Sequence, residues 1–542
     1  MEIQFRPQNH LKAENKKDKE NIQFKGAFDA ASLGLRFLDT NQAWGANAVD
    51  LCSMVIPRTT VDFVNRGPAA GTETARREAS GTINHSLIGV YGSLAGLAFA
   101  MAMNKSFGIR ADKIFADNET YDIIGKFYHD NYHNKAVSDN LSATLNDVFK
   151  SVKTSSNGQE KALNQFEIDN VVKTITGALD KADNKSYSLP KDTKQYLVNY
   201  ILQSTGSESD YKLKGFNKET SSNLSTFIDN VYGIAKSLKE KNVIDAFKET
   251  DFSKNKFINS IKNVNKGRTI AGMAIGSLVG MSIQPLNIYL TKRKTGSDGF
   301  VGVEGREKDT SAGFKVWKAA AAAVFGGGII ADLARKEGGL LKNVQFKGMI
   351  PTINQFKLIY GVTIASRFLA ARDKDELRES VVKDVLGFLN WLVLGNFVAK
   401  GVALALDKDK SLLKNPQETA FLKKTLKTRD EVLIEGMKKL NLSSVTEDGK
   451  ALKFSEMLKK LPAGEAGKAV KKQLRILNIA QVAGYLYSGL VLGVGIPKLN
   501  IYMTNKSEAK RQAKLAAQKA AQAPSNAVQY HMDKFAADKT NA

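Results

Sequence analysis

The sequence predicts an all-α, multi-pass helical membrane protein with two sequence-related halves and a soluble helical insertion in each half. Three observations lead to this fold class. Four stretches of about 20 residues carry almost no charge, basic residues flank them, and one motif occurs twice at a constant offset. A hydrocarbon core about 30 Å thick is crossed by about 20 apolar residues in a helix, so each stretch is long enough to span it.

The borders of these stretches divide the chain into segments. In order they are a disordered N-terminal segment (1–25), a lead-in segment with the first apolar helix (26–104), a polar all-α insertion (105–268), the second apolar helix (269–291), a connecting helical segment with the second lead-in (292–380), the third apolar helix (381–406), a second polar insertion (407–475), the fourth apolar helix (476–504) and a basic Ala-rich helix with a disordered tail (505–542).

The predicted apolar helices differ in charge content and in length. The first run, from Ser86 to Met103, and the second, 269–291, contain no charge, and Lys400 interrupts the third. A weaker run from Ala319 to Ala331 has only about 13 residues, so a buried or interfacial helix is expected there instead of a span. The first 25 residues have no apolar core, which predicts no cleavable signal peptide.

The polar insertions have a different pattern. In residues 105–268, Leu141, Leu145 and Val148 recur at helical spacing, and Leu224, Phe227 and Ile228 do the same. Turn-forming residues separate these groups. A soluble bundle of five or six amphipathic helices is therefore expected, with a shorter helical counterpart in 407–475.

An internal repeat is the clearest sign of organisation. Residues 276–291 and 489–504 are identical at eight of sixteen positions, with a constant offset of 213. A weaker similarity outside the motif is the Arg-Glu dipeptide, which occurs as Arg77-Glu78 and again as Arg378-Glu379. We expect a parallel duplication, because each half contributes an even number of predicted spans, with both insertions on one side of the membrane. The most similar part of the motif is Leu286, Asn287, Ile288 and Tyr289 in the first copy and Leu499, Asn500, Ile501 and Tyr502 in the second.

Glycines at a spacing of four recur in the apolar helices. Small residues on one helix stripe let a second helix approach closely, which favours packing where lipid supplies no hydrophobic driving force. The same stripe also suits a tight crossing in a soluble protein. The predicted packing positions are Gly92, Gly96, Gly272, Gly276, Gly280, Gly489 and Gly493.

The formal net charge of +24 indicates an anionic partner. Residues 105–268 are nearly balanced in charge, and the excess lies beside the apolar runs, as at 292–294 and 506–514. This distribution favours anionic lipid headgroups as the partner. Nucleic acid is not expected, since no nucleic-acid-binding motif accompanies the charge. Self-association or contact with other membrane proteins is a further expectation.

Candidate functional residues lie at the mouths of the apolar helices. They are Arg77, Glu78, Asn84, His85, Arg378 and Glu379. A charged or polar group at membrane depth lines a cavity, binds a headgroup or makes a packing hydrogen bond. His129 and His133 have a metal-compatible spacing but no third ligand in sequence, and no nucleotide or nucleophile motif occurs. No catalytic residue, metal or cofactor is predicted.

Three functional interpretations remain open. The favoured one is a structural, scaffolding or interaction role in a bacterial envelope membrane; enzyme activity is left open but is not favoured. The second is a transporter, channel or lipid-acting enzyme that uses the Arg-Glu pairs. The third is a soluble or peripheral helical protein that binds anionic lipid and buries its apolar hairpins in its own core.

Overall fold

A computed structural model confirms that the chain is predominantly helical. It describes residues 27–540 except for the gaps 41–44, 46, 49, 133–135, 157–158, 183–185, 206–212, 216–217, 220–222, 304, 349–350, 390–394 and 445–451. The predicted disordered segment 1–25 lies outside the described residues.

The first helices form a hairpin and a bent rod. After α1 (Ala27–Thr40), a π-helical turn η1 (Leu51–Val55) leads into α3 (Ile56–Arg66). Gly67, at φ 85°, turns the chain into α4 (Pro68–Ser86), which bends by 48° into α5 (Ile88–Phe107). α5 is apolar up to its last turn, which contains Lys105, whereas α3 and α4 both carry charged residues.

Residues 111–254 form the first insertion. Three of its described α-helices, α6, α8 and α10, begin at side chains that accept a backbone N–H: Asp117, Asn164 and Asn223. The helical elements are η2 (Ala111–Lys113), α6 (Asn118–Asn131), α7 (Val137–Ser151), α8 (Gln165–Asp180), α9 (Lys191–Thr205), α10 (Leu224–Ser237), α11 (Lys241–Ala246) and η3 (Phe252–Lys254).

A small antiparallel sheet corrects the expectation of a purely helical insertion. Its strands are β1 (Lys153–Ser156), β2 (Gln159–Ala162), β3 (Leu213–Gly215) and β4 (Lys218–Glu219), in the order β2-β1-β3-β4. Lys153 is opposite Ala162 on one side and Lys214 on the other. The polar side chains of these strands give no helical periodicity and no alternation of apolar residues, so the sequence carries little signal for them.

The remaining described residues form helices joined by loops. The elements are α12 (Lys256–Thr295), α13 (Ala312–Arg335), α14 (Gly339–Asn343), α15 (Ile353–Ala370), α16 (Lys374–Leu389), α17 (Gly395–Leu406), α18 (Arg429–Lys439), α19 (Phe454–Lys460), α20 (Glu465–Ser488), a π-helical segment η5 (Gly489–Gly495) and α21 (Ile496–Thr540).

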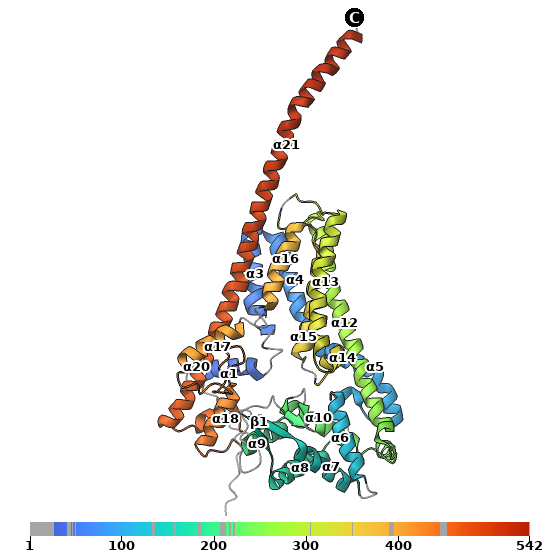
Figure 1. Ribbon diagram of the computed structural model, residues 1–542, viewed down its shortest axis with the longest axis vertical. Helices are drawn as coiled ribbons and strands as arrows, with labels where there is room; N and C mark the ends of the chain where they lie inside the picture. Colours follow the sequence, from blue (N-terminus) through green and yellow to red (C-terminus); the bar gives the residue numbers. More distant parts are fainter. Residues whose placement is uncertain are drawn as a thin grey trace, which may run out of the picture.

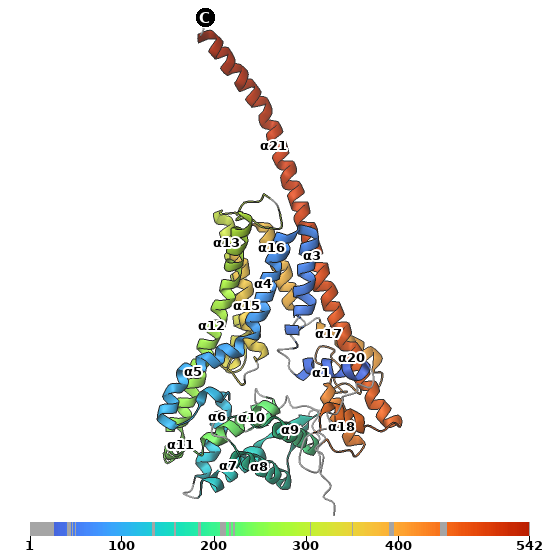
Figure 2. The same ribbon diagram turned by 180° about the vertical axis from the view of Figure 1, so that it is seen from behind.

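The polar insertions lie together at one end of the molecule, and α21 projects from the other end (Figures 1 and 2). Buried apolar side chains of both insertions, including Val231 and Leu433, belong to one hydrophobic cluster. Gln203 links the insertions, since its Oε1 accepts from Ser444 Oγ at 2.9 Å. Between the two ends, α12 and α21 run in the same direction on opposite sides of α3, α4, α15 and α16.

Among the described residues, three helices are long and apolar enough to cross a membrane, by length and composition, and the bent α4–α5 pair is a fourth candidate. The three are α12, α13 and the continuous rod from Glu465 to Ala520. For α13 the expectation of a short, buried helix was wrong. The helix has 24 residues and only 17% of its most apolar part is buried, while the interfacial alternative stays a prediction.

Two further expectations concern the third apolar helix and the C-terminus. The described residues of 381–406 belong to α16 and α17, which lie on either side of the gap 390–394, so the predicted third apolar helix stays a prediction. At the C-terminus, the predicted disordered tail is wrong because α21 remains helical to Thr540. Alanine, lysine and glutamine have high helix propensity, which the disorder prediction underweighted.

The glycines of α5 and α12 lie where these helices meet. A Cβ on Gly272 would lie 3.1 Å from Gly92 Cα, so the two backbones approach closely. Gly96 faces the guanidinium of Arg268. Further along α12, Gly276 and Gly280 face Ile359 and Thr363 of α15.

The motif glycines of η5 differ in the space around them. A Cβ on Gly493 would lie 2.5 Å from Ser53 O and 2.7 Å from Pro57 Cβ. For Gly489, the nearest atom to such a Cβ is Ser53 Oγ at 4.0 Å. η5 therefore packs against η1 through Gly493, and no larger residue fits there without a backbone shift.

Gly493→Ala is expected to lower stability by about 1–3 kcal/mol, because the added methyl group would overpack this contact. Gly489→Ala is the matched control, and its effect is expected to be neutral or slightly stabilising since alanine favours a helix by up to about 1 kcal/mol over glycine. Thermal unfolding in detergent, followed by circular dichroism, measures both. Equal midpoints for the two variants would contradict the packing argument.

Candidate functional site

The helices α3, α4, α15 and α16 carry charged side chains inward, between α12 and α21 (Figures 1 and 2). We call two features of this region the central charge cluster and the reciprocal pairs. The central charge cluster is Arg58, Arg77, Glu78, Arg367, Lys383 and Asp384. The reciprocal pairs are Arg66–Glu379 and Arg372–Glu73. All ten side chains are buried or nearly so.

Glu78 is the hub of the central charge cluster. Its Oε1 lies 3.2 Å from both Lys383 Nζ and Arg77 Nε, and its Oε2 lies 3.4 Å from Arg58 Nη1. Arg367 Nη1 is 3.6 Å from the same Oε2 and 3.0 Å from Asp384 Oδ1. Buried carboxylates of this kind are tolerated because they are paired with cations.

The reciprocal pairs join the N-terminal part of the chain (27–295) to the C-terminal part (312–540). Arg66, at the end of α3, pairs with Glu379 of α16. Arg372, after the end of α15, pairs with Glu73 of α4, with 2.6 Å between Nη2 and Oε1. Each part therefore supplies one arginine, at the end of α3 or just after α15, and one carboxylate, from α4 or α16.

Two further contacts are reciprocal in the same way, each between a glycine of one part and an arginine of the other part. A Cβ on Gly81 of α4 would lie 3.2 Å from Arg367 Nη2, and a Cβ on Gly387 of α16 would lie 3.2 Å from Arg58 Nη2. Arg58 Nε also donates to the carbonyl oxygen of Leu492 in η5, at 3.2 Å. This hydrogen bond connects the central charge cluster to η5, where the helix widens locally from α-helical to π-helical geometry.

The repeated motif contacts α4 and α16 in matching ways. Asn287 Nδ2 donates to Glu73 O at 3.0 Å, and Asn500 Nδ2 donates to Glu379 O at 3.2 Å. The threonine of each copy accepts from an arginine. Arg76 Nη2 lies 2.7 Å from Thr291 Oγ1, and Arg378 Nη2 lies 2.6 Å from Thr504 Oγ1. The other motif positions Leu286, Tyr289, Leu499 and Tyr502 are exposed, while Ile501 is buried.

The two Arg-Glu pairs singled out in the sequence do not occupy matching places. Arg77 and Glu78 lie in the central charge cluster, whereas Glu379 pairs with Arg66, and Arg378 pairs with Asp375 at 2.6 Å. By its contacts, the counterpart of Glu78 is Asp384. The signal was present in the sequence: Glu73 and Glu78 recur, 306 residues later, as Glu379 and Asp384, and Arg77 recurs as Lys383.

Asn84 and His85 lie apart from the ion pairs. Asn84 Nδ2 donates to Gly276 O at 3.1 Å, and Tyr91 Oη donates to Asn84 Oδ1 at 2.9 Å. The His85 ring packs on Tyr360, with 4.8 Å between centroids, and its buried Nε2 has no hydrogen-bond partner in the described chain. Asn84 thus links α4 to α12, and His85 contributes mainly packing.

The loop from 296 to 311 crosses the reciprocal pairs. The ring of Phe300 lies 5.4 Å from the Arg66 guanidinium carbon and 5.9 Å from that of Arg372. Arg306 reaches Asp373 at 3.0 Å and Glu508 at 3.1 Å, so the loop also ties α21 to the turn before α16. Burial raises the pKa of Asp373, although the Glu376 amide and Arg306 favour its ionised form. This loop has no apolar periodicity, so its place over the reciprocal pairs is not predictable from the sequence.

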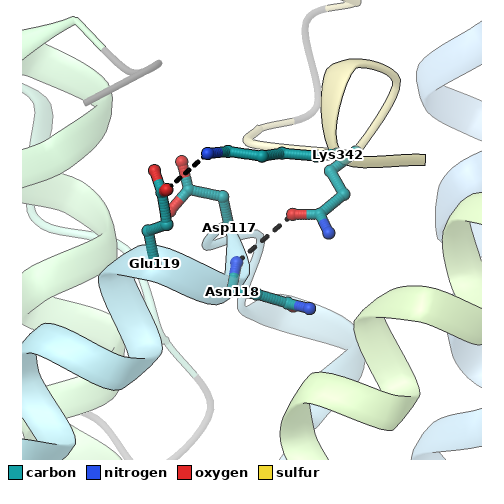
Figure 3. Close-up of a pocket in the computed structure, with 5 residues that line it drawn as sticks. Asp117, Asn118, Glu119 and Lys342 are labelled. Carbon is teal, nitrogen blue, oxygen red and sulfur yellow. Dashed lines mark hydrogen bonds and ion pairs between the residues drawn. The ribbon is translucent and has the colours of Figure 1, made fainter. Parts of the chain in front are cut away.

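A polar pocket of about 170 Å³ lies between the first insertion and the connecting segment (Figure 3). Asp117, Asn118, Glu119, Lys342 and Gln345 line it. Lys342 Nζ pairs with Glu119 Oε1 at 2.6 Å, and Gln345 Oε1 accepts from the Asn118 N–H at 3.3 Å. These contacts connect α6 to α14, so the pocket walls hold the insertion against the helices above it.

Among the described residues, no group of three or more His, Cys, Asp and Glu side chains is placed to hold a metal ion. In the central charge cluster each carboxylate is paired with cations, and Arg367–Glu78 and Lys383–Glu78 attach one helix pair electrostatically to the other.

Comparison with known proteins adds no assignment: no protein-family model matches the chain, and neither do any curated protein or any solved structure.

Arg372→Gln is expected to destabilise the protein by about 3–5 kcal/mol, because it leaves Glu73 and Glu376 buried without their cation. Lys248→Gln, which breaks an exposed pair with Asp245, is the control and should change stability by no more than about 1 kcal/mol. For the other pair, the double variant Arg66→Gln/Glu379→Gln should lose less stability than the two single variants added together. Additive losses in thermal unfolding would show that Arg66 and Glu379 are not coupled.

Proposed function

We propose that this protein is an integral, multi-pass membrane scaffold. It holds a helical domain on one side of a bacterial envelope membrane and projects a long basic helix from the other side. The observation that carries the proposal is a belt of exposed apolar side chains on the candidate spans. An apolar surface of this extent on a soluble monomer would be an aggregation hazard, whereas a bilayer covers it at no cost.

The belt surrounds the charged interior. Leu278 of α12 is 66% exposed, Val324 of α13 is 78% exposed and Leu490 of η5 is 68% exposed. The arginines of the reciprocal pairs and of the central charge cluster are buried behind them. Apolar side chains outside and paired charges inside are the distribution that a hydrocarbon solvent favours.

A duplication into two parallel halves is part of the proposal. It is supported by the matched contacts of Asn287 and Asn500 and by the reciprocal pairs. In this scheme α3, α4 and α12 correspond to α15, α16 and α21, and α13 returns the chain between the halves. In this scheme the two halves have the same orientation because α13 returns the chain to the side on which the first half began. An even number of spans in each half is then not required.

The buried ion pairs favour a scaffold over a transporter, channel or lipid-acting enzyme. Transport by rocking of two halves requires an interface that opens. Here Arg66–Glu379 and Arg372–Glu73 join the halves reciprocally, and opening would strand all four charges in a low-dielectric interior. Glu78 is likewise surrounded by cations of both halves, so it is not free to bind a substrate.

Alkaline carbonate extraction tests membrane integration. The full-length protein is expected to stay in the membrane pellet and to enter solution only with detergent, because its spans would have to expose the apolar belt to water. Release into the carbonate supernatant would contradict the proposal and favour the peripheral, lipid-binding interpretation.

Cysteine labelling tests the sidedness. The chain has one cysteine, Cys52, so Cys52→Ser gives a silent background. In that background, Lys181→Cys on the first insertion and Lys519→Cys on α21 place single exposed thiols at the two ends. An impermeant maleimide should label one site in right-side-out vesicles and the other in inverted vesicles. Labelling of both sites from the same side would contradict a scaffold that spans the membrane.

A further inference from the structure

Both copies of the repeated motif end in exposed basic residues at the end of the molecule where α21 projects. The first copy is followed by Arg293 and Lys294, and the second by Lys506 and Lys510. All four side chains are exposed. We call these four residues the basic collar.

The two halves of the collar lie at the same level along the bundle. Thr291, just before Arg293, bonds to Arg76 of α4, and Thr504, just before Lys506, bonds to Arg378 of α16. The reciprocal pairs connect these two helices at the same end. Two separate stretches of sequence therefore supply cations to one layer of the molecule.

The collar residues follow directly on the apolar belt. Tyr289 and Tyr502 are 59% and 63% exposed, and they mark its edge as aromatic side chains do at a membrane–water interface. At 1.5 Å per residue, Lys506 and Lys510 lie about 3 Å and 9 Å beyond Thr504 along α21. The headgroup layer on each side of a bilayer is about 5–8 Å thick, so flexible lysine side chains at both positions reach it.

The collar cations are also available for an external anion. Within the described chain no ion pair involves Arg293, Lys294, Lys506 or Lys510, whereas the neighbours Lys292 and Arg511 pair with Asp298 and Glu508. Unpaired, exposed cations at headgroup depth attract anionic phosphates. Nucleic acid is a poorer fit, since a duplex or strand on the collar would have to lie against the bilayer surface.

We propose that the basic collar binds anionic phospholipid headgroups and thereby selects the lipid around the α21 end of the protein. This inference rests on the proposed membrane location, and it assigns to four residues a lipid preference that a scaffold does not by itself require. Each basic residue near a charged membrane surface strengthens its attraction about fivefold, so the four together should produce a clear preference.

The test uses the full-length protein in nanodiscs that contain equal amounts of phosphatidylcholine and phosphatidylglycerol. After transfer to a zwitterionic detergent, the retained lipids are counted by mass spectrometry. The natural protein should retain phosphatidylglycerol several-fold over phosphatidylcholine. The variant Arg293→Gln/Lys294→Gln/Lys506→Gln/Lys510→Gln should lose this preference.

A matched control removes four exposed lysines from the first insertion: Lys150→Gln/Lys181→Gln/Lys191→Gln/Lys241→Gln. It has the same net charge as the collar variant and should keep the preference. If the collar variant also keeps it, or if both variants lose it, the assignment to the collar is wrong. The assignment is also wrong if the collar binds a single-stranded RNA oligonucleotide in preference to phosphatidylglycerol.

Failure of the collar can be told apart from failure of the scaffold. A protein that resists carbonate extraction but shows no lipid preference overturns only the collar. A protein that leaves the membrane in carbonate overturns the membrane location, and with it the collar.

Discussion

The central constraint on this structure is that charged side chains buried between the helices must be paired, since the exposed surface around them is largely apolar. Arg66 and Arg372 each find their carboxylate in the opposite part of the chain, and Glu78 collects cations from both parts. An isolated charge at this depth would cost several kcal/mol, so the buried charges of each helix pair are stabilised by their partners on the other pair.

The other features of the bundle depend on these pairs. The repeated motif contacts the backbone of Glu73 and Glu379, the two carboxylates of the reciprocal pairs, so the long helices α12 and α21 are held at the same points. The loop 296–311 covers both arginines with Phe300 and binds α21 through Arg306. The loop 296–311 therefore contacts both α21 and the reciprocal pairs.

Part of the site was readable in the sequence. Arg77 and Glu78 are both in the central charge cluster, and the motif residues Asn287 and Asn500 make matching bonds. The pairing of Arg77-Glu78 with Arg378-Glu379 followed from identical letters, but the structure matches Glu78 with Asp384, a different letter with the same charge. A match of two identical residues does not reveal which turn of a helix faces inward. At the position equivalent to Glu78, the negative charge is retained although the residue type differs.

The sequence by itself determined the helical class, the apolar runs and the offset of 213 between the motif copies, because these depend on residues close together in the chain. Only the tertiary structure decided that α13 is long and exposed, that a small sheet lies in the first insertion and that Arg66 pairs with Glu379. Arg66 and Glu379 are 313 residues apart, and they form an ion pair only when the helix pair α3–α4 packs against the helix pair α15–α16. No local pattern encodes such a choice of partner, because several cations of equal charge compete for each carboxylate.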